Sequence, residues 1–127
     1  MKLENRLNKI LSDKLNNENG LLEILSIVDT INSIDDSLTH LAYYENDKDF
    51  FNTYYYNNPY EVARAINYGC YNFADRFVCI NSYGNIESYS TLSVKLEIKN
   101  SIADIADRMI ELMDKNEYIK EKVEELI

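Results

Sequence analysis

Apolar residues recur at three- and four-residue spacing in the first third of the chain, which predicts two amphipathic helices. The first covers residues 2–16 and the second residues 21–34, and together they would form an N-terminal hairpin. The segment between them, residues 16–20, is rich in asparagine and predicts a turn, with Gly20 as the cap that ends the first helix. The apolar stripe of the second helix is too wide for a hairpin to cover by itself. Either the rest of the domain or a second copy of the chain would therefore cover it.

The middle of the chain gives weaker signals. Residues 38–44 suit a short strand or a helical turn. The tyrosine-rich residues 50–56 favour a helix that ends before Pro59. Proline is well placed in the first turn of a helix, so a further helix is expected from Pro59 to Gly69, with Asn58 as its cap.

Two strands and a turn are predicted next. Residues 76–81 and 86–90 favour strands, and residues 82–85 between them combine glycine and asparagine as hairpin turns do. Residues 91–98 alternate between apolar and polar side chains, which predicts a third strand.

The C-terminal part returns to helical spacing. Asn100 or Ser101 would cap a helix, and residues 117–127 would form a last helix or extension. The predicted fold class is α+β, with an N-terminal helical hairpin, a small antiparallel sheet of about three strands and C-terminal helices. The expected division is residues 1–34 and residues 35–127, joined in one compact unit.

The charge of the chain changes the choice of partners. Its 127 residues contain 22 acidic and 13 basic side chains, so the net charge is −9. Such a chain should repel nucleic acid and anionic membranes, because phosphate binding requires clustered lysine and arginine. It should be attracted to basic surfaces instead. The alternative is that the acidic residues only keep the protein soluble.

Cysteine usage and hydropathy predict a cytoplasmic protein. Cys70 and Cys79 have neither the spacing nor the neighbours of a zinc site, and we expect both thiols to be reduced. The first residues are polar, unlike a secretory signal, and no apolar segment approaches the roughly 20 residues of a membrane span.

The sequence contains no recognisable catalytic or cofactor motif. His40 is the only histidine and lies in a half-apolar segment that favours a structural or surface role. With 3 glycines in the chain, a glycine loop that cradles phosphate is not expected. The acidic pairs Asp35–Asp36 and Asp47–Asp49 lack the ligand number of a calcium loop. We therefore predict no enzyme activity, no metal and no cofactor.

Acidic and tyrosine side chains are the candidate binding residues. Four carboxylates follow helical spacing in the C-terminal region and would share one face, and tyrosines beside acids offer contact area at low entropic cost. The alternatives are a solvated helix face and tyrosines that wall the core. The predicted partner-binding residues are Asp47, Asp49, Tyr54, Tyr55, Asp104, Asp107, Glu111 and Asp114.

Two segments resemble a known group of proteins. Residues 59–72 are PYEVARAINYGCYN, residues 75–88 are DRFVCINSYGNIES, and the acidic sequence IADIAD follows at residues 102–107. This pattern resembles a largely uncharacterised family of small acidic proteins from phages and mobile elements of low-GC bacteria. The resemblance covers residues 38–110 and departs from the family at Cys70, where aspartate is preferred, and at Ser82, where glycine is preferred.

The resemblance implies an accessory gene of a phage, with anti-CRISPR or antirestriction proteins as the analogy. The first hypothesis is therefore an inhibitor that binds a host nuclease through acidic residues and tyrosines, with imitation of DNA as its mode of binding. The second is a binder of a nucleotide signal, with stacking tyrosines and Arg64 or Arg76. The third is a structural or regulatory oligomer, with residues 1–34 as the surface of a homodimer.

Overall fold

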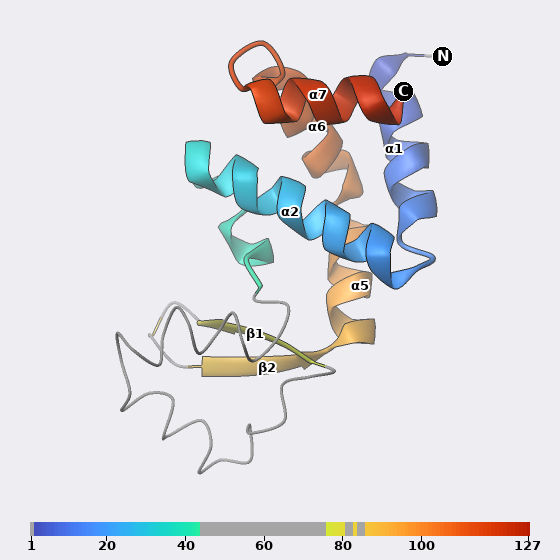
Figure 1. Cartoon of the computed structure of the whole chain (residues 1–127). Coiled ribbons are helices and arrows are strands. Elements are labelled where there is room, and N and C mark those ends of the chain that lie inside the picture. Colours follow the sequence, from blue (N-terminus) through green and yellow to red (C-terminus); the bar gives the residue numbers. More distant parts are fainter. Residues whose placement is uncertain (1, 44–75, 81–82, 84–85) are drawn as a thin grey trace. The chain divides into compact units, whose positions relative to one another are not determined.

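The computed structural model describes residues 2–43, 76–80, 83 and 86–127 (Figure 1). The chain forms two compact units, one from residues 1–42 with residues 95–127 and the other from residues 43–94. The described elements are α1 (Leu3–Lys14), α2 (Glu18–Ile34), the short 3-10 helix η1 (Thr39–Leu41), β1 (Arg76–Ile80), β2 (Ile86–Ser90), α5 (Thr91–Asn100), α6 (Ile102–Leu112) and α7 (Glu117–Leu126). The class is α+β, as predicted, with two described strands in place of the expected three.

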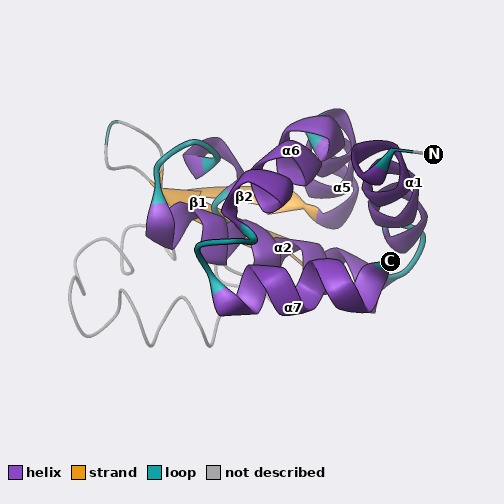
Figure 2. Cartoon of the chain, turned by 90° about the horizontal axis from the view of Figure 1, so that it is seen from above, coloured by secondary structure: helices purple, strands orange, loops and turns teal. Residues whose placement is uncertain are grey.

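The helical unit is built around α6, which contacts α1, α2 and α7. Figure 2 shows α1 joined to α2, and α6 joined to α7, by loops. Each helix contributes apolar residues one turn apart, so that one stripe of every helix is removed from water. The fully buried side chains at the centre include Leu7, Leu11, Ile24, Ile27, Ile31, Ile105, Ala106, Met109, Ile119 and Val123.

The N-terminal hairpin is confirmed, but its turn is shorter than predicted. The second helix begins at Glu18 because the Asn17 side chain caps it, with Oδ1 accepting a hydrogen bond from the Gly20 N–H at 2.7 Å. Gly20 therefore lies in the first turn of α2 and does not cap α1. A Cβ at this position would lie 2.8 Å from the Lys14 carbonyl carbon and closer still to its oxygen. Glycine is required here by the close approach of two backbones.

The wide apolar stripe of α2 is covered within the chain. Its residues from Leu21 to Ile31 that face inward are at most 8% exposed, and only Ile34, at the end of the helix, is 41% exposed. Of the two coverings that the sequence left open, docking on the rest of the chain is the one observed. A homodimer through residues 1–34 stays a prediction, without the support of an uncovered stripe.

The end of α2 is fastened by one amide side chain. Asn32 Nδ2 donates to the Leu38 carbonyl at 2.9 Å, and Asn32 Oδ1 accepts from the Leu38 N–H at 3.1 Å. Because these two bonds imitate a backbone pair, they hold the chain where it turns into η1. The structure thus selects the helical turn from the two forms expected for residues 38–44.

The second unit contains the predicted β-hairpin. The strands β1 and β2 pair antiparallel, with Phe77 opposite Tyr89 and Cys79 opposite Glu87. The predicted turn at residues 82–85 falls largely outside the described residues. So do the tyrosine-rich helix of residues 50–56 and the helix from Pro59 to Gly69.

The predicted third strand at residues 91–98 is wrong, because these residues form α5. The helix starts directly after β2, where Ser90 Oγ accepts a hydrogen bond from the Ser93 N–H at 3.2 Å, as an N-terminal cap does. In a helix, the apolar residues at every second position fall on two different sides. Val94 and Ile98, one turn apart, are fully buried, whereas Leu92 is 76% and Leu96 57% exposed.

The C-terminal helices α6 and α7 confirm the helical spacing. Ser101 occupies the cap position of α6, as one of the two expected residues, but its side chain makes no capping bond. At the start of α7, Asn116 Oδ1 accepts from the Ile119 N–H at 3.0 Å. The last predicted segment is therefore a capped helix.

Candidate interaction surface

Half of the predicted partner-binding residues lie together on α6 and the turn that follows it. Asp104, Asp107 and Glu111 project from α6, and Asp114 follows in the turn, with all four side chains exposed. We call these four residues the acidic face. The other predicted residues, Asp47, Asp49, Tyr54 and Tyr55, lie outside the described part of the chain.

The acidic face is directed away from the core because of helix periodicity. The buried side chains of α6 are Ile102, Ile105, Ala106, Met109 and Leu112. At 100° per residue, Asp107 and Glu111 fall on the side opposite this apolar stripe. Asp104, Asp107 and Glu111 are therefore presented to solvent by a helix whose other side is anchored in the core.

Arg108 changes the charge of this face, which the sequence indicated as almost unpaired. Its guanidinium forms an ion pair with Glu111 one turn along α6 and a second with Asp35, just after α2. Among the described residues, Asp104, Asp107 and Asp114 form no ion pair. The acidic face thus consists of three unpaired carboxylates and one that is neutralised by an arginine.

Asp35 holds the other side of this arrangement. Ser37 donates hydrogen bonds to the Asp35 carboxylate, one of them from its backbone N–H at 3.0 Å, and the Arg108 guanidinium adds a favourable charge. These interactions outweigh partial desolvation and hold the pKa of Asp35 below its ordinary value. The carboxylate therefore stays ionised, and the end of α2 is fixed to α6.

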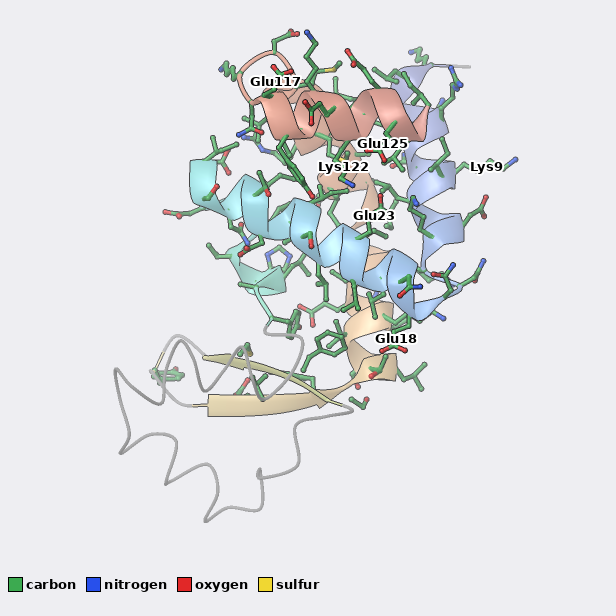
Figure 3. The ribbon with its side chains drawn as sticks, in the orientation of Figure 1. Lys9, Glu18, Glu23, Glu117, Lys122 and Glu125 are labelled. Atoms are coloured by element: carbon green, nitrogen blue, oxygen red, sulfur yellow. The ribbon has the colours of Figure 1, made fainter. Side chains whose placement is uncertain are left out.

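A second charge network joins the first, second and last helices. Figure 3 shows Glu23 on α2 and Lys122 on α7 directed toward each other. Glu23 accepts from Lys14 Nζ at 2.8 Å through one oxygen and lies 3.4 Å from Lys122 Nζ through the other. Lys122 also lies 5.7 Å from the centre of the Tyr118 ring. Because positive and negative charges pair within this network, we interpret its role as structural: it holds the three helices together.

The pKa values of the network agree with mutual pairing. The hydrogen bond from Lys14 lowers the pKa of the Glu23 carboxyl, burial opposes this effect, and the charges of Lys14 and Lys122 lower the pKa further. Burial lowers the pKa of the Lys122 ammonium, but Tyr118, Glu23 and Glu125 together raise it above its ordinary value. Both groups are therefore charged near neutral pH.

Replacing Glu23 with glutamine should weaken folding at pH 7 by about 1 kcal/mol, because the paired carboxylate is only partly buried. A lowered pKa gives stability that is present above the ordinary glutamate pKa of about 4.3 and is lost as the pH falls through the folded value. The difference between Glu23→Gln and the unaltered protein should accordingly shrink toward zero in acid. Urea denaturation from pH 7 to acid pH measures it.

The matched control for this experiment is Asp29→Asn on the exposed side of α2, where no described residue pairs with the carboxylate. It should change stability little at any pH. An equal loss for Glu23→Gln at all pH values would contradict the ion-pair assignment.

The β-hairpin carries a small aromatic cluster. The Tyr43 ring meets Phe77 and Tyr89 edge to face, with ring centres 6.4 Å and 5.6 Å apart. The Tyr89 hydroxyl donates to the Glu87 carboxylate, and this bond, together with burial and the neighbouring Cys79, raises the pKa of Tyr89. With its pKa raised, the Tyr89 hydroxyl stays protonated near neutral pH and acts here as a hydrogen-bond donor.

Neither metal nor membrane chemistry is indicated by the described residues. Within residues 2–43, 76–80, 83 and 86–127, no three histidine, cysteine, aspartate or glutamate side chains gather as metal ligands would. His40 is exposed on η1. None of the helices described is both long enough and apolar enough to cross a bilayer.

Comparisons with protein-family models, with curated proteins and with solved structures find no match to this chain. The resemblance to a family of small acidic phage proteins therefore stays a prediction from the sequence.

Proposed function

We propose that this protein is an inhibitor that binds a nucleic-acid-binding nuclease and occupies its nucleic-acid groove with the acidic face. The observation that carries the proposal is the exposure of Asp104, Asp107 and Asp114, which no described residue neutralises. Unpaired like charges in a row cost a few tenths of a kcal/mol for each neighbouring pair in the free protein. A basic partner would relieve this repulsion.

The spacing of the carboxylates supports imitation of a nucleic-acid strand. Helix geometry places the unpaired carboxylates Asp104 and Asp107 about 4.5 Å apart along the axis of α6. One strand of DNA carries a phosphate about every 3.4 Å. The spacing of these two charges is therefore similar to that of successive phosphates on one strand.

Rigid support of the acidic face favours binding over solubility alone. Ile105 and Met109 anchor α6 on its inner side and are fully buried, and Arg108 ties its outer edge to Asp35. Charges held on a fixed helix lose little conformational entropy on binding. A purely solubilising face would not need this support.

The proposed class of partner, a bacterial defence nuclease, rests on the resemblance found in the sequence. The resemblance to small acidic phage proteins supports a nuclease of bacterial defence, such as a CRISPR or restriction effector, as the target. The protein would act in the cytoplasm of the bacterial host, where such nucleases meet incoming DNA.

The proposal predicts that removing three charges from the acidic face weakens partner binding about tenfold or more, since each exposed ion pair contributes up to about 1 kcal/mol. The test variant is Asp104→Asn/Asp107→Asn/Asp114→Asn. The tagged protein is used to capture nucleases from a low-GC bacterial lysate at low salt. The captured nuclease is then purified, and its affinity is measured with and without competing double-stranded DNA.

The matched control is Asp13→Asn/Glu121→Gln/Glu124→Gln, which removes the same number of charges from exposed positions on α1 and α7. It should bind almost as well as the unaltered protein. Equal weakening by both variants would mean that only net charge matters. Binding that DNA does not compete would contradict the proposed groove.

A further inference from the structure

Helix α5 exposes a face that combines leucine with lysine. Leu92 and Leu96 lie one turn apart and are 76% and 57% exposed, whereas Val94 and Ile98 on the other side of the same helix are fully buried. Lys95 and Lys99 fall beside the two leucines, because positions i, i+3, i+4 and i+7 share one side of a helix. We call Leu92, Lys95, Leu96 and Lys99 the α5 face.

Within the described part of the chain, the charges of the α5 face are uncompensated. Neither Lys95 nor Lys99 forms an ion pair with a described residue. The two ammonium groups are spaced one turn apart, so they repel each other weakly. A face that combines two exposed leucines with a half-buried and an exposed lysine suits an acidic helical surface.

The acidic face provides such a surface on every copy of the chain. Its carboxylates Asp104 and Asp107 are about one turn apart, as the two lysines are, and are unpaired among the described residues. Ala103 is exposed and Ile110 half-buried on the neighbouring side of α6. Each of the two faces thus has a charged side and an apolar side.

We propose that the α5 face docks on the acidic face of a second copy of this chain, and that a two-fold axis repeats the contact to form a homodimer. The helices α5 and α6 follow one another with only Ser101 between them, so each protomer carries the two faces on successive helices. A two-fold interface pairs each surface with its complement twice. Direct antiparallel pairing of two α5 faces would instead bring lysines together.

The dimer is held by few leucines and by exposed charges, which makes it weak and sensitive to salt. The inference stands apart from the proposed function, since it requires no nuclease. Formation of this dimer covers the acidic face. A basic partner and a second copy of the chain would then compete for the same carboxylates.

Charge exchange between the two faces tests the dimer. One variant is Lys95→Glu/Lys99→Glu, and the other is Asp104→Lys/Asp107→Lys. Each should be monomeric in sedimentation experiments under low-salt conditions in which the unaltered protein dimerises, with the dissociation constant raised more than tenfold. An equimolar mixture of the two variants should form a heterodimer, because each reversed face then meets its complement in the other chain.

The variant that carries all four exchanges should recover the homodimer, and this recovery also shows that the exchanged residues are tolerated. Circular dichroism verifies the helix content of each variant. A monomeric unaltered protein, a dimer that either pair of exchanges leaves intact, or a mixture that stays monomeric would each overturn the proposal. The Lys95→Glu/Lys99→Glu variant keeps the acidic face, so its binding to a nuclease reports on the proposed function separately.

Discussion

Replacing Gly20 with alanine is expected to destabilise the protein by about 2 kcal/mol, although alanine is ordinarily the better helix residue by about 1 kcal/mol. The new Cβ would lie 2.8 Å from the Lys14 carbonyl carbon, and the group it meets is backbone, which cannot rotate away. The end of α1 and the first turn of α2 would have to separate. The loss should appear as a lower urea midpoint in equilibrium unfolding.

Ser26→Ala provides the comparison for Gly20→Ala, because Ser26 is exposed in the middle of α2. There the added helix propensity acts without a clash, so stability should stay the same or rise slightly. If Gly20→Ala also raised the urea midpoint, the close contact between the two backbones would be refuted.

Truncating Ile105 to alanine should cost about 2–5 kcal/mol, the largest effect of any change considered for this protein. Ile105 is fully buried on α6, the helix that contacts α1, α2 and α7. Removal of the side-chain atoms beyond Cβ leaves a cavity between several helices. These helices cannot all move inward to fill the cavity. Thermal and urea unfolding both measure the change.

Ile34→Ala removes the same atoms from the exposed end of α2, where Ile34 is 41% exposed. It should cost no more than about 1 kcal/mol, because less transfer energy is lost and no cavity forms. Similar costs for Ile105→Ala and Ile34→Ala would contradict the position of α6 at the centre of the helical unit.

Local patterns predicted α1, α2, α6, α7 and the two described strands. Leu7 and Leu11 are one turn apart and buried, and residues 76–80 pair with residues 86–90. Helix α5 was mistaken for a strand because its apolar residues occur at every second position. The same pattern places apolar residues four positions apart, as in one face of a helix. The capping pair Ser90 and Ser93 was the signal for a helix, and no turn residue separates β2 from α5.

The candidate surface was predictable to the same degree. Helix periodicity alone placed Asp104, Asp107 and Glu111 on one side of α6, whereas Asp114 lies in the turn after the helix. The pairing of Arg108 with Asp35 joins residues 73 positions apart, and nothing in either neighbourhood indicates it. Likewise, the bond of Glu23 to Lys122 connects positions 99 residues apart. Such partners depend on how the helices pack, which one sequence does not encode locally.

The helical unit takes residues from both ends of the chain, and this has a consequence for synthesis on the ribosome. When α2 has left the exit tunnel, α6 has not yet been translated, so only α1 is available to cover Ile24, Ile27 and Ile31. At about 5–20 residues per second, the delay lasts several seconds. During that time the nascent chain exposes an apolar stripe to chaperones. We therefore expect stalled chains that end before residue 101 to bind ribosome-associated chaperones more strongly than the released protein does.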